Sequence, residues 1–484
     1  MSRSTDQRLV LGLDIGTTSV KVCLVEANGG GGTVLARQAK DTQAGVPSEL
    51  GCEGNKQNVP KIMSALHICV SRLPRELLRQ VVSIGVSGQM HGVMLWRYGE
   101  TVEVGDSSSS SRPWSRIDCD SSRYDVVAGC VSSLYTWQDS RCDPAFLAEL
   151  PRPASYLRAY SGYGCNTLFW LAKNRPEKLK RFNCAGTIQD FCVAMLCNLS
   201  RPIMSVQNAA SWGYFDPVAG QWNTELLQEA SFPVDLLPTV VDSGTLAGCL
   251  AEPWHCIPAG TPIGVAMGDL QCSVLSTLRN SDDAVLNIST SAQLAFIANN
   301  FHPKMADDNW PVEYFPYFGG ETLAVAASLN GGNALATFIS MLQQWTLDLG
   351  FHLPQGNLWS RVMELAGDDA AESELCVVPT LLGERHAPQQ NASICNIDPG
   401  NLSLGKVFKS ICRGIITNLH SVMPREMLLD ANISRILGIG SALTRNKVLQ
   451  EEVRLCYQLP VVFIPGGDAA WGAALAVASL APPS

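Results

Sequence analysis

The amino-acid sequence predicts an α/β protein. Short apolar runs typical of strands alternate with amphipathic stretches typical of helices, and several of these runs end in Gly, Ser or Asp, as at residues 81–88, 262–269, 284–291 and 435–441. With 46% hydrophobic and 16% charged residues, the chain is too apolar to be disordered and can bury a large core. Because ligands in such folds bind beyond the carboxyl ends of strands, the polar strand ends are the candidate sites.

The length and charge of the chain limit the number of its domains and the classes of its partners. At 484 residues, it is long enough for two or three domains. A formal net charge of −9 argues against a nucleic-acid partner, because surfaces that bind the phosphate backbone are basic. No apolar run reaches the length of about 18 residues that a membrane span needs, and residues 1–16 lack the features of a secretory or transit peptide. We therefore expect a cytoplasmic protein without a membrane partner.

The cysteines favour the same compartment. There are 17 of them, an odd number scattered through apolar or mixed segments, which is typical of reduced thiols rather than a disulfide framework. Cys192 and Cys197 have a spacing that can suit a zinc ion, but no second pair or histidine follows them. We interpret these two residues as buried core thiols.

Local patterns predict the first elements of the chain. The apolar run before Asp14 indicates a strand, and the glycine turn after it returns into a second apolar run. The four glycines at 29–32 separate two strand-like runs and therefore indicate the tip of a hairpin. The serine run at 107–111 and the polar segment at 299–309 have no periodic apolar face, so we expect loops there.

Two helices and a packed terminal segment are predicted in the second half. One helix begins after Asn330, where apolar residues such as Leu335 and Ile339 recur at spacings of three and four. Another follows Gly440 and must end before Pro460. The segment 469–480 is rich in Ala and Gly, and small side chains permit close approach, so we expect it to lie against a sheet.

The strongest single motif is LGLDIGTTSVK at residues 11–21. A strand ends in Asp14, and the turn gathers backbone N–H groups, hydroxyl groups and Lys21, which together suit a polyanion such as a phosphate group. Asp14 can hold a hydrated Mg²⁺. A P-loop is excluded because the turn returns into a strand instead of opening a helix. An ordinary Gly-Thr hairpin with an exposed lysine is the alternative.

Two further strand ends carry turns of a similar kind. The strand at 284–288 ends in Ser289, Thr290 and Ser291, although hydroxyl-rich turns also serve as helix caps. Residues 438–446 combine a strand, a glycine turn and a helix start. GIGSAL in this segment is close to the dinucleotide fingerprint GxGxxG, which leaves an NAD-dependent dehydrogenase as an alternative, but Leu443 stands where the third glycine belongs.

The candidate general base is Asp269, which Gly268 places at the end of an apolar strand. A carboxylate there can orient a hydroxyl group and accept its proton during phosphoryl transfer, while an Asp that caps the following helix is the alternative. Polyol ligands are held by carboxylates, amides, Arg and aromatic faces, and the segments GQMHG and TWQDSR supply that mixture. Their candidate residues are Gln89, Met90, His91, Trp137, Asp139 and Arg141. Taken alone, a residue such as His91 is more often an ordinary turn histidine than a ligand, and one such as Trp137 is more often a core residue.

Taken in order, these motifs resemble the FGGY family of carbohydrate kinases. DIGTTSVK, GQMHG, TWQDSR, GDLQ, NISTS and GIGSALTRN follow one another as in that family across residues 9–478. The resemblance implies the actin/hexokinase-like ATPase fold, in which two RNase H-like domains enclose a central cleft. It implies an N-terminal FGGY domain at 1–272, with the sugar site and the catalytic Asp, and a C-terminal FGGY domain at 273–484, with the adenosine site.

The resemblance also implies an activity. Within the family, longer stretches such as VSGQMHGV, SVQNAASWGYFD, AASLNGGNALATF, PTLLGERHAP and GSALTRN resemble the members that phosphorylate sedoheptulose. They imply a kinase that uses ATP and Mg²⁺ to convert sedoheptulose to sedoheptulose 7-phosphate, which feeds the pentose phosphate pathway. A kinase for another ketose or polyol, such as xylulose or ribulose, is one alternative. An ATPase of the same fold without sugar kinase activity is an alternative of a different class. The expected partners are these small molecules alone. The oligomeric state stays open, and a monomer is one of the options.

Roles for individual residues follow from the same resemblance. Asp269 is implied as the catalytic base and as a sugar contact, and Asp14 and Asp269 are implied at the metal. The implied nucleotide-binding residues are Asp14, Gly16, Thr17, Thr18, Lys21, Thr290, Gly331, Gly332, Asn333, Gly440, Ser441 and Asn446. The implied sugar-binding residues are Gln89, Met90, His91, Trp137, Asp139, Arg141 and Asp269.

The chain departs from the family pattern at two places. The segment around Trp170 and Leu171 lacks the lysine of the family signature. Val206 stands where related kinases often have an acidic residue, which affects the neighbouring Gln207 and Asn208. We therefore assign no ligand role to the segment around Trp170, and the sugar contacts of the loop with Gln207 and Asn208 stay open.

Overall fold

A computed structural model describes residues 8–28, 31–48, 50, 54–99, 112–117, 123–307, 310–368, 373–464 and 467–480. The chain divides into two compact units: the first comprises Met1–Ser276, Phe315–Gly320 and Asp468–Ser484, and the second comprises Thr277–Tyr314 and Glu321–Gly467. The expected division at residue 272 differs from these units at the end of the chain, which belongs with the first unit. The serine run at 107–111 lies outside the described residues.

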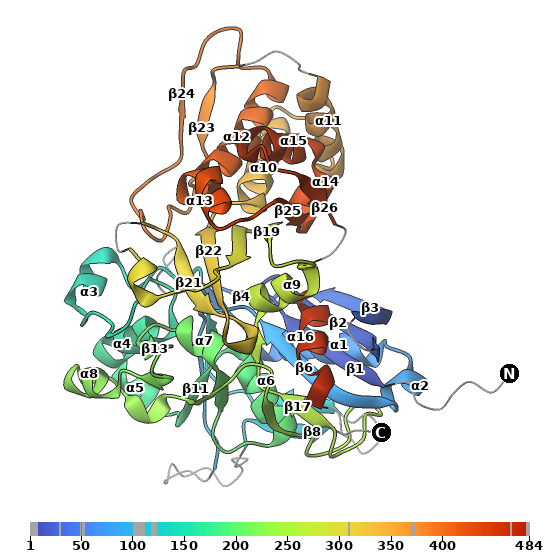
Figure 1. The fold of residues 1–484 in the computed structure, drawn as a ribbon, viewed down its shortest axis with the longest axis vertical. Coiled ribbons are helices and arrows are strands. Elements are labelled where there is room, and N and C mark those ends of the chain that lie inside the picture. The colour runs from blue at the N-terminus through green and yellow to red at the C-terminus, as the bar shows by residue number, and fades with distance from the viewer. Residues whose placement is uncertain are drawn as a thin grey trace, which may run out of the picture. The chain divides into compact units, whose positions relative to one another are not determined.

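The first unit is built on a mixed β-sheet. Its strands are β1 (Leu9–Ile15), β2 (Ser19–Asn28), β3 (Gly31–Asp41), β6 (Val81–Gly88), β16 (Leu246–Cys249), β17 (Pro262–Gly264) and β18 (Met267–Gly268). They lie in the order β16-β17-β6-β1-β2-β3, and β18 also pairs with β6 (Figure 1). Strands β1, β2 and β3 are antiparallel, whereas β6 runs parallel to both β1 and β17. The predicted return of the chain from β1 into a second strand is confirmed, and β2 and β3 pair as the predicted hairpin. Gly31 and Gly32 belong to β3, and residues 29 and 30 of the expected tip lie outside the described residues.

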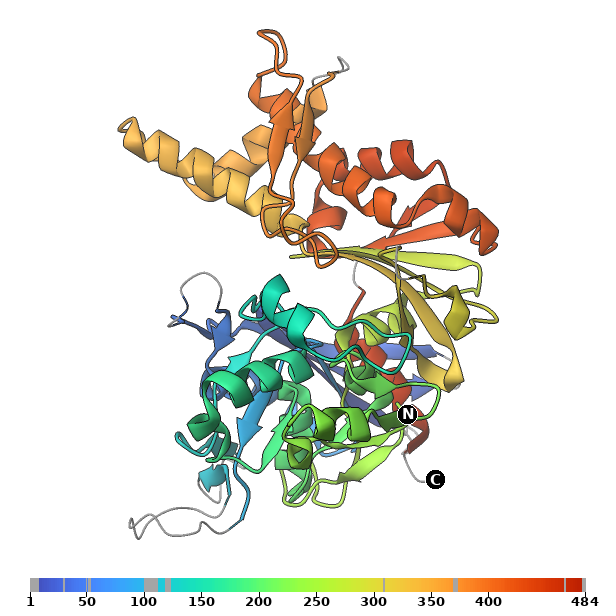
Figure 2. The same cartoon turned by 90° about the vertical axis from the view of Figure 1, so that its left-hand side faces the viewer.

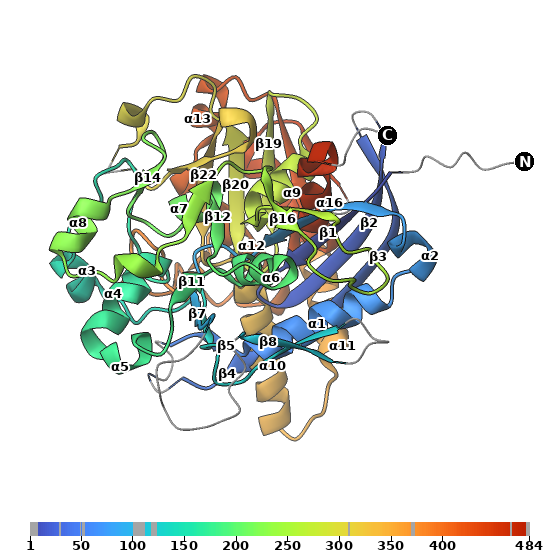
Figure 3. The same cartoon turned by 90° about the horizontal axis from the view of Figure 1, so that it is seen from below.

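One face of this sheet is covered by α1 (Val59–Ser71), which runs along it in Figure 3. Asn58 caps the helix through a hydrogen bond from Lys61 N, and Pro60 occupies the first turn, where its missing N–H costs nothing. Leu11 and Leu13 of β1 share a buried cluster with the apolar side of this helix. The alternate side chains of β1 point to the other face.

The opposite face is covered by α16 (Ala469–Ala476). A Cβ atom on Gly12 would lie 1.8 Å from Ala470 O, and one on Gly85 would lie 2.0 Å from Ala473 O. The helix backbone can approach the strands this closely only because the strands carry glycine there. The prediction that the Ala- and Gly-rich segment packs on a sheet is confirmed, and this packing explains why the end of the chain belongs to the first unit.

The remaining elements of the first unit are shorter. The strands are β4 (Gly45–Val46), β5 (Lys56–Gln57), β7 (Met94–Trp96), β8 (Trp114–Ile117), β9 (Arg123–Val126), β10 (Leu134–Tyr135), β11 (Cys184–Gly186), β12 (Ile203–Ser205), β13 (Phe215–Asp216), β14 (Gln221–Trp222) and β15 (Thr239–Val241). The helices are α2 (Arg75–Leu78), α3 (Pro144–Glu149), α4 (Gly164–Asn174), α5 (Pro176–Leu179), α6 (Ile188–Cys197), α7 (Val206–Ala210), α8 (Thr224–Glu229) and α9 (Asp269–Thr277), with 3₁₀ turns at Val234–Leu236, Phe318–Gly320 and Ala478–Leu480.

The second unit repeats the strand pattern of the first. Its sheet contains β19 (Asp283–Ile288), β20 (Ala292–Ile297), β22 (Thr322–Ser328), β25 (Arg435–Ile439), β26 (Val461–Phe463) and the short edge strand β21 (Glu313–Pro316), in the order β21-β22-β20-β19-β25-β26. Strands β22, β20 and β19 are antiparallel, and β19, β25 and β26 are parallel. The shorter elements are β23 (Cys376–Val378), β24 (Ser393–Cys395) and a 3₁₀ turn at Pro303–Met305.

Helices of the second unit confirm two predictions and refine one of them. They are α10 (Gly332–Asp348), seen side-on in Figure 2, α11 (Gln355–Asp368), α12 (Leu404–Val422), α13 (Arg425–Asp430), α14 (Ser441–Arg445) and α15 (Lys447–Tyr457). The helix expected after Asn330 is α10. The helix expected after Gly440 is interrupted, because Asn446 has extended backbone angles and caps α15 by accepting a hydrogen bond from Leu449 N. None of the helices that the structure describes has the length and hydropathy of a membrane span.

Candidate functional site

Strand register brings the acidic candidates of the first unit to one edge of its sheet. Asp14 of β1 lies opposite Ser87 of β6 and opposite Lys21 of β2, and Met267 of β18 lies opposite the same Ser87. Because β1, β6 and β18 run parallel, their carboxyl ends meet at this edge. Asp269 begins α9, one residue after β18 ends. The fold therefore gathers both candidate carboxylates and the lysine.

Asp14 is a buried carboxylate with one oxygen atom engaged. Lys21 Nζ lies 3.6 Å from its Oδ2. Burial raises the pKa of Asp14 to about 6, although the neighbouring Lys21 opposes that shift. Its Oδ1 atom is buried and has no hydrogen-bond partner among the residues that the structure describes. A buried carboxylate oxygen without a partner is suited to a cation or to a water molecule of its hydration shell.

Asp269 has the protonation behaviour of a general base. Its side chain is half-buried, and its Oδ1 accepts a hydrogen bond of 2.8 Å from Leu270 N. Burial, followed by the nearby charge of Asp14, raises the pKa of Asp269 to about 7. A carboxylate whose pKa lies close to neutral is largely ionised above pH 7 and still basic enough to take a proton.

A hydrogen-bonded ring joins the glycine turn after β1 to the candidate sugar-binding segments. Thr17 Oγ1 accepts from Trp137 Nε1 at 2.9 Å and donates to Gln89 Oε1 at 3.2 Å. Gln89 Nε2 donates to Gln57 Oε1 at 3.0 Å, and Gln57 Nε2 returns to Thr17 O at 2.7 Å. Sequence reasoning missed Gln57, because a single glutamine in a two-residue strand carries no motif. The ring fixes the amide of Gln89 and leaves Trp137 half-buried.

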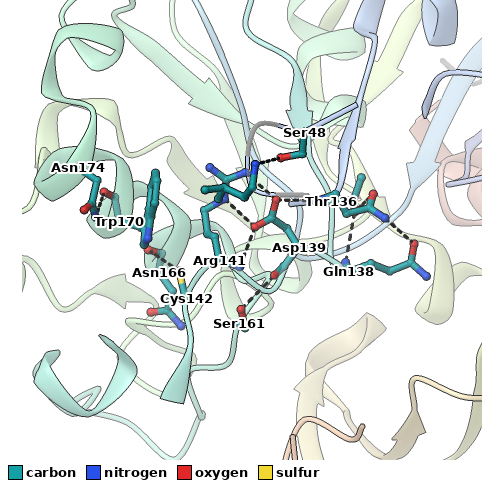
Figure 4. Close-up of polar contacts among 12 residues, drawn as sticks. Ser48, Thr136, Gln138, Asp139, Arg141, Cys142, Ser161, Asn166, Trp170 and Asn174 are labelled. Atoms are coloured by element: carbon teal, nitrogen blue, oxygen red, sulfur yellow. Dashed lines mark hydrogen bonds and ion pairs between the residues drawn. The ribbon is translucent and has the colours of Figure 1, made fainter. Parts of the chain in front are cut away.

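Asp139 and Arg141 satisfy each other in a buried ion pair. Arg141 Nε lies 2.6 Å from Asp139 Oδ1 and Nη2 lies 2.8 Å from Oδ2, and Figure 4 shows the two side chains facing each other. The guanidinium group also lies over the rings of Tyr135, at 4.4 Å, and Trp170, at 5.0 Å. Breaking such a pair would leave a buried charge uncompensated. The pair therefore fixes the segment that carries Trp137.

Met90 and His91 lie just beyond β6, where His91 adopts a left-handed backbone with φ of 71°. The His91 ring stacks on Tyr163 with 4.4 Å between centroids. Its Nδ1 lies 2.8 Å from Ser211 O, and a carbonyl oxygen can only accept, so Nδ1 carries the proton. This contact holds the imidazole in one orientation.

Two buried glutamines flank Gly268, the residue before Asp269. Gln207 Oε1 accepts a hydrogen bond of 3.3 Å from Gly268 N, and a Cβ atom on Gly268 would lie 2.4 Å from Gln271 Oε1 and 2.9 Å from Met90 Sδ. Within the described part of the chain, Gln207 Nε2 and Gln271 Oε1 are buried and have no hydrogen-bond partner. An unpaired donor and an unpaired acceptor beside the candidate base match the two hydrogen-bonding functions of a hydroxyl group. No role had been given to either glutamine; Gln271 within GDLQ was the available signal.

The second unit brings its neutral candidates together through backbone contacts. Gly332 N donates to Ser289 O at 2.9 Å, and Asn333 N donates to Thr290 O at 3.0 Å. Gly440 has a φ of 94°, and a Cβ atom there would lie 2.3 Å from the carbonyl oxygen that ends β19. The turn after β19, the start of α10 and the turn after β25 are therefore adjacent.

Glu384 supports this group of turns and was missed by sequence reasoning. Its carboxylate is buried and accepts hydrogen bonds from Leu329 N at 3.1 Å, Asn330 Nδ2 at 3.0 Å and Asn418 Nδ2 at 2.8 Å. Those contacts fix the backbone immediately before Gly331. Glu384 lies in the stretch PTLLGERHAP, which the sequence analysis singled out. Nothing in that stretch predicts a contact with a turn more than fifty positions earlier in the chain.

Three other candidates take different positions. Thr18 and Ser441 are exposed at their turns. Asn446 is buried, and its amide is engaged at both ends: Oδ1 accepts from Leu449 N at 3.1 Å and Nδ2 lies 3.6 Å from Cys412 Sγ. In this conformation Asn446 shapes the start of α15.

Comparison with known proteins identifies the class. The model of the N-terminal domain of the FGGY family of carbohydrate kinases matches residues 9–102 and 133–276. The chain belongs to the FGGY family of carbohydrate kinases. Sedoheptulokinase of Mus musculus is 46% identical to it over 473 residues, and sedoheptulokinase of Homo sapiens is 48% identical over 475 residues. In each case the match covers 96% of both proteins.

Solved structures establish the fold. The xylulose kinase from Rhodospirillum rubrum superimposes with a TM-score of 0.73 and 16% identity, covering 98% of this chain and 90% of that one. The Plasmodium falciparum glycerol kinase with ADP gives a TM-score of 0.71 and 14% identity, covering 97% and 89%. The predicted actin/hexokinase-like ATPase fold is confirmed.

Proposed function

We propose that the chain transfers the γ-phosphoryl group of ATP to the terminal hydroxyl group of sedoheptulose, giving sedoheptulose 7-phosphate. Nearly full-length similarity to two proteins named sedoheptulokinase supports the choice of sugar. The observation that carries the chemistry is Asp269, a carboxylate with a pKa of about 7 at the same sheet edge as Asp14 and Lys21. The odd number and scattered positions of the 17 cysteines favour the cytoplasm as its compartment.

Asp269 acts as the general base. Its carboxylate accepts a hydrogen bond from the sugar hydroxyl, orients the oxygen toward the γ-phosphorus and takes the proton as the new P–O bond forms. The bond between the γ-phosphorus and its bridging oxygen breaks as that bond forms, and ADP leaves. Little covalent work falls to the protein, so position and charge account for most of the rate enhancement.

Lys21 and the turn after β1 hold the phosphates. The Lys21 pKa is raised, chiefly by Asp14, so the ammonium group stays protonated at neutral pH. The Thr18 hydroxyl group and the backbone N–H groups of Thr17 and Thr18 supply further donors, because the Thr17 hydroxyl group is engaged with Gln89 and Gly16 N with Ser19 O. Locally arranged donors of this kind allow a chain with a net charge of −9 to bind a polyanion.

Asp14 fits a magnesium ion. Its unpaired Oδ1 suits a water molecule of a hydrated Mg²⁺, and Asp269 lies at the same edge of the sheet. When bound with ATP, Mg²⁺ neutralises charge on the phosphates during transfer. The described residues hold no group of three or more His, Cys, Asp or Glu arranged for a metal. Two carboxylates are nonetheless enough, because Mg²⁺ keeps water and phosphate oxygens as its other ligands.

The sugar is held by the ring of contacts around β6. Gln89 and His91 offer fixed polar groups, and the half-buried Trp137 offers an aromatic face. We assign Gln271 Oε1 and Gln207 Nε2 to a sugar hydroxyl, because burial without a partner would otherwise cost free energy. Met90 lies beside them, and the Asp139–Arg141 pair keeps the Trp137 segment in place.

The second unit binds the nucleoside end of ATP. The proposed contacts are Thr290, Gly331, Gly332, Asn333, Gly440 and Ser441. A Cβ atom on Gly331, Gly332 or Gly440 would lie 2.5, 2.2 or 2.3 Å from the backbone of residues 288–291, so only glycine lets these turns pack together. Asn446 contributes by fixing the start of α15.

A coupled ADP-release assay tests the proposal. Sedoheptulose, xylulose, ribulose, gluconate and glycerol are compared at equal ATP and Mg²⁺ concentrations. We expect sedoheptulose to give the highest kcat/KM, by at least about tenfold over the two pentuloses, since it has two more hydroxyl-bearing carbons and each well-made hydrogen bond to them contributes about 1 kcal/mol. A higher value for xylulose or ribulose would reassign the substrate. ADP release at the same rate without any sugar would instead indicate an ATPase.

A further inference from the structure

Two exposed cysteines lie directly opposite each other in the second unit. The short antiparallel strands β23 and β24 pair side by side, with Cys376 facing Cys395 (Figure 1). Both residues are exposed, and among the described cysteines Cys249 alone shares that property. The remaining described thiols are buried or half-buried, so most of them are protected from reagents in solvent.

The register fits a disulfide bond. Residues directly opposite in an antiparallel pair have Cα atoms about 4.5–5.5 Å apart, and disulfides form over about 4.4–6.8 Å. Opposite residues also point to the same face of the sheet. Cys395 Sγ donates a hydrogen bond of 3.8 Å to Cys376 O, so its side chain lies against the opposite residue. Burial raises the pKa of the Cys376 thiol, and the neighbouring Cys395 thiol adds to that shift. The two cysteines are therefore already neighbours in the reduced protein.

We propose that Cys376 and Cys395 are a dithiol oxidation site that closes to an intramolecular disulfide with hydrogen peroxide. The thiolate of one cysteine attacks a peroxide oxygen, which breaks the O–O bond and gives a sulfenic acid with release of hydroxide. The second thiolate then attacks that sulfur and displaces hydroxide as the S–S bond forms. Two thiols and one H₂O₂ give one disulfide and two waters, and the two electrons pass from sulfur to oxygen.

The closed loop contains a residue that supports the turns of this unit. The two cysteines are 19 positions apart, and Glu384 between them holds Leu329 N and the Asn330 amide. Because β23 and β24 are already paired in a compatible register, the bond locks the present geometry instead of changing it. We expect the oxidised protein to be more stable than the reduced protein, since the crosslink restricts the unfolded chain. This inference is independent of the proposed function.

Peroxide treatment followed by alkylation with iodoacetamide tests the site. Intact mass should fall by about 2 Da before alkylation, the mass of the two hydrogen atoms that leave. A linked peptide containing both cysteines should appear, and the Tm should rise by at least about 2 °C. C376S and C395S should each lose the linked peptide and the rise in Tm, whereas the matched control C249S should keep both. Alkylation of both cysteines after oxidation, or dimers linked through them, would overturn the proposal.

A trivalent arsenical provides a measurement that does not depend on oxidation. Such a reagent binds two thiolates at once and needs them adjacent. The reduced protein should take up one phenylarsine group at this pair, and C249S should behave identically. C376S and C395S should each bind at least about tenfold more weakly, because one arsenic–sulfur bond is lost. Equal binding by wild type and C376S would show that the two thiols do not act together.

Discussion

The sheets of the two units have the same strand pattern but carry different chemistry at the equivalent turn. In the first unit, β1 is antiparallel to β2 and parallel to β6, and in the second unit β19 has the same relations to β20 and β25. The first turn is flanked by Asp14 and Lys21. The second turn presents the hydroxyl groups of Ser289–Ser291.

This difference shows how one scaffold supports two tasks. Burial moves the pKa values of Asp14 and Asp269 toward neutrality, which makes the first edge sensitive to protons and cations. The turns of the second unit are held by backbone bonds and by close contacts at glycines such as Gly332 and Gly440. We infer that proton transfer and metal binding depend on the first unit, and that the second contributes shape and neutral donors. Substitutions on each side can test this division.

The largest effect is expected for Asp269→Asn. Asparagine cannot accept the hydroxyl proton, so kcat should fall by about 10²- to 10⁴-fold, with the affinity for ATP nearly unchanged. Steady-state kinetics and calorimetry with a non-hydrolysable ATP analogue measure the two quantities. Asp190→Asn is the matched control, because burial also raises the pKa of Asp190 to about 7 but that residue caps α6. Near wild-type turnover in Asp269→Asn would remove the residue from the mechanism.

A smaller effect is expected for Asp14→Asn. Loss of the carboxylate should raise the Mg²⁺ concentration for half-maximal rate by roughly 10- to 100-fold, the range seen when a partner of a bound metal is removed. A titration of initial rate against Mg²⁺ at saturating ATP measures this. Asp143→Asn is the control, because its side chain caps α3 through Phe146 N and asparagine can cap in the same way. An unchanged Mg²⁺ dependence in Asp14→Asn would place the metal elsewhere.

The sequence predicts the features that depend on neighbouring residues, but it does not predict contacts between segments that are far apart in the chain. Asp14, Lys21 and Asp269 could be placed because a carboxylate or lysine beside a glycine at a strand end is a local pattern. The ring through Gln57 could not, since it joins segments from separate sheets. The sequence displays the charges of Asp139 and Arg141 but does not show that they neutralise each other.

The packing of the end of the chain was only partly predictable. Small residues indicate that the segment containing Ala470 approaches a sheet closely, but they do not say which sheet. The matching glycines, Gly12 and Gly85, lie in strands of the first unit, nearly four hundred positions or more away. A pairing of complementary surfaces over that separation has no local signal, and the expected boundary at residue 272 missed it.

Activity should also depend on pH, because Asp269 of the first unit must be ionised to accept a proton. With a pKa of about 7, Asp269 is mostly protonated at pH 6 and mostly ionised at pH 8, so kcat/KM for the sugar should rise by about tenfold between them. A profile that is flat over this range, after the enzyme's stability is checked at each pH, would contradict the assignment.

The same shift has a consequence for stability with the opposite sign. The folded state holds a proton on Asp269 that the unfolded state, with a carboxyl pKa of 3.8, releases earlier. The free energy of unfolding should therefore fall as pH rises from about 4 through 7. Asp269→Asn should be more stable than wild type at pH 8 in urea denaturation and closer to it at pH 5.

In the second unit, Gly440→Ala should weaken ATP binding without a change in pH dependence. The new Cβ atom would meet the carbonyl oxygen of Ile288 at 2.3 Å and would force an L-residue into a φ of 94°. We expect the KM for ATP to rise by about 5- to 50-fold, which corresponds to about 1–2 kcal/mol of strain. Gly350→Ala is a matched control, because its φ of 84° is equally left-handed but no atom lies within 4 Å of the new Cβ. An equal rise in the KM for ATP in the two variants would mean that the left-handed backbone of an alanine, and not the close contact at this turn, causes the effect.

The smallest effect is expected for Gln271→Met, which keeps the volume and removes the amide. The buried Oε1 of Gln271 has no hydrogen-bond partner in the described chain. In the complex, a sugar hydroxyl group should therefore donate a hydrogen bond to this oxygen. Loss of one neutral hydrogen bond contributes about 0.5–1.5 kcal/mol, so the KM for sedoheptulose should rise by roughly 2- to 10-fold. The KM for ATP should stay the same, because Gln271 flanks Gly268 beside the base and not the phosphate-binding turn. If both KM values rise together, the amide of Gln271 supports the packing around Asp269. If only the KM for sedoheptulose rises, the amide binds a hydroxyl group of the sugar.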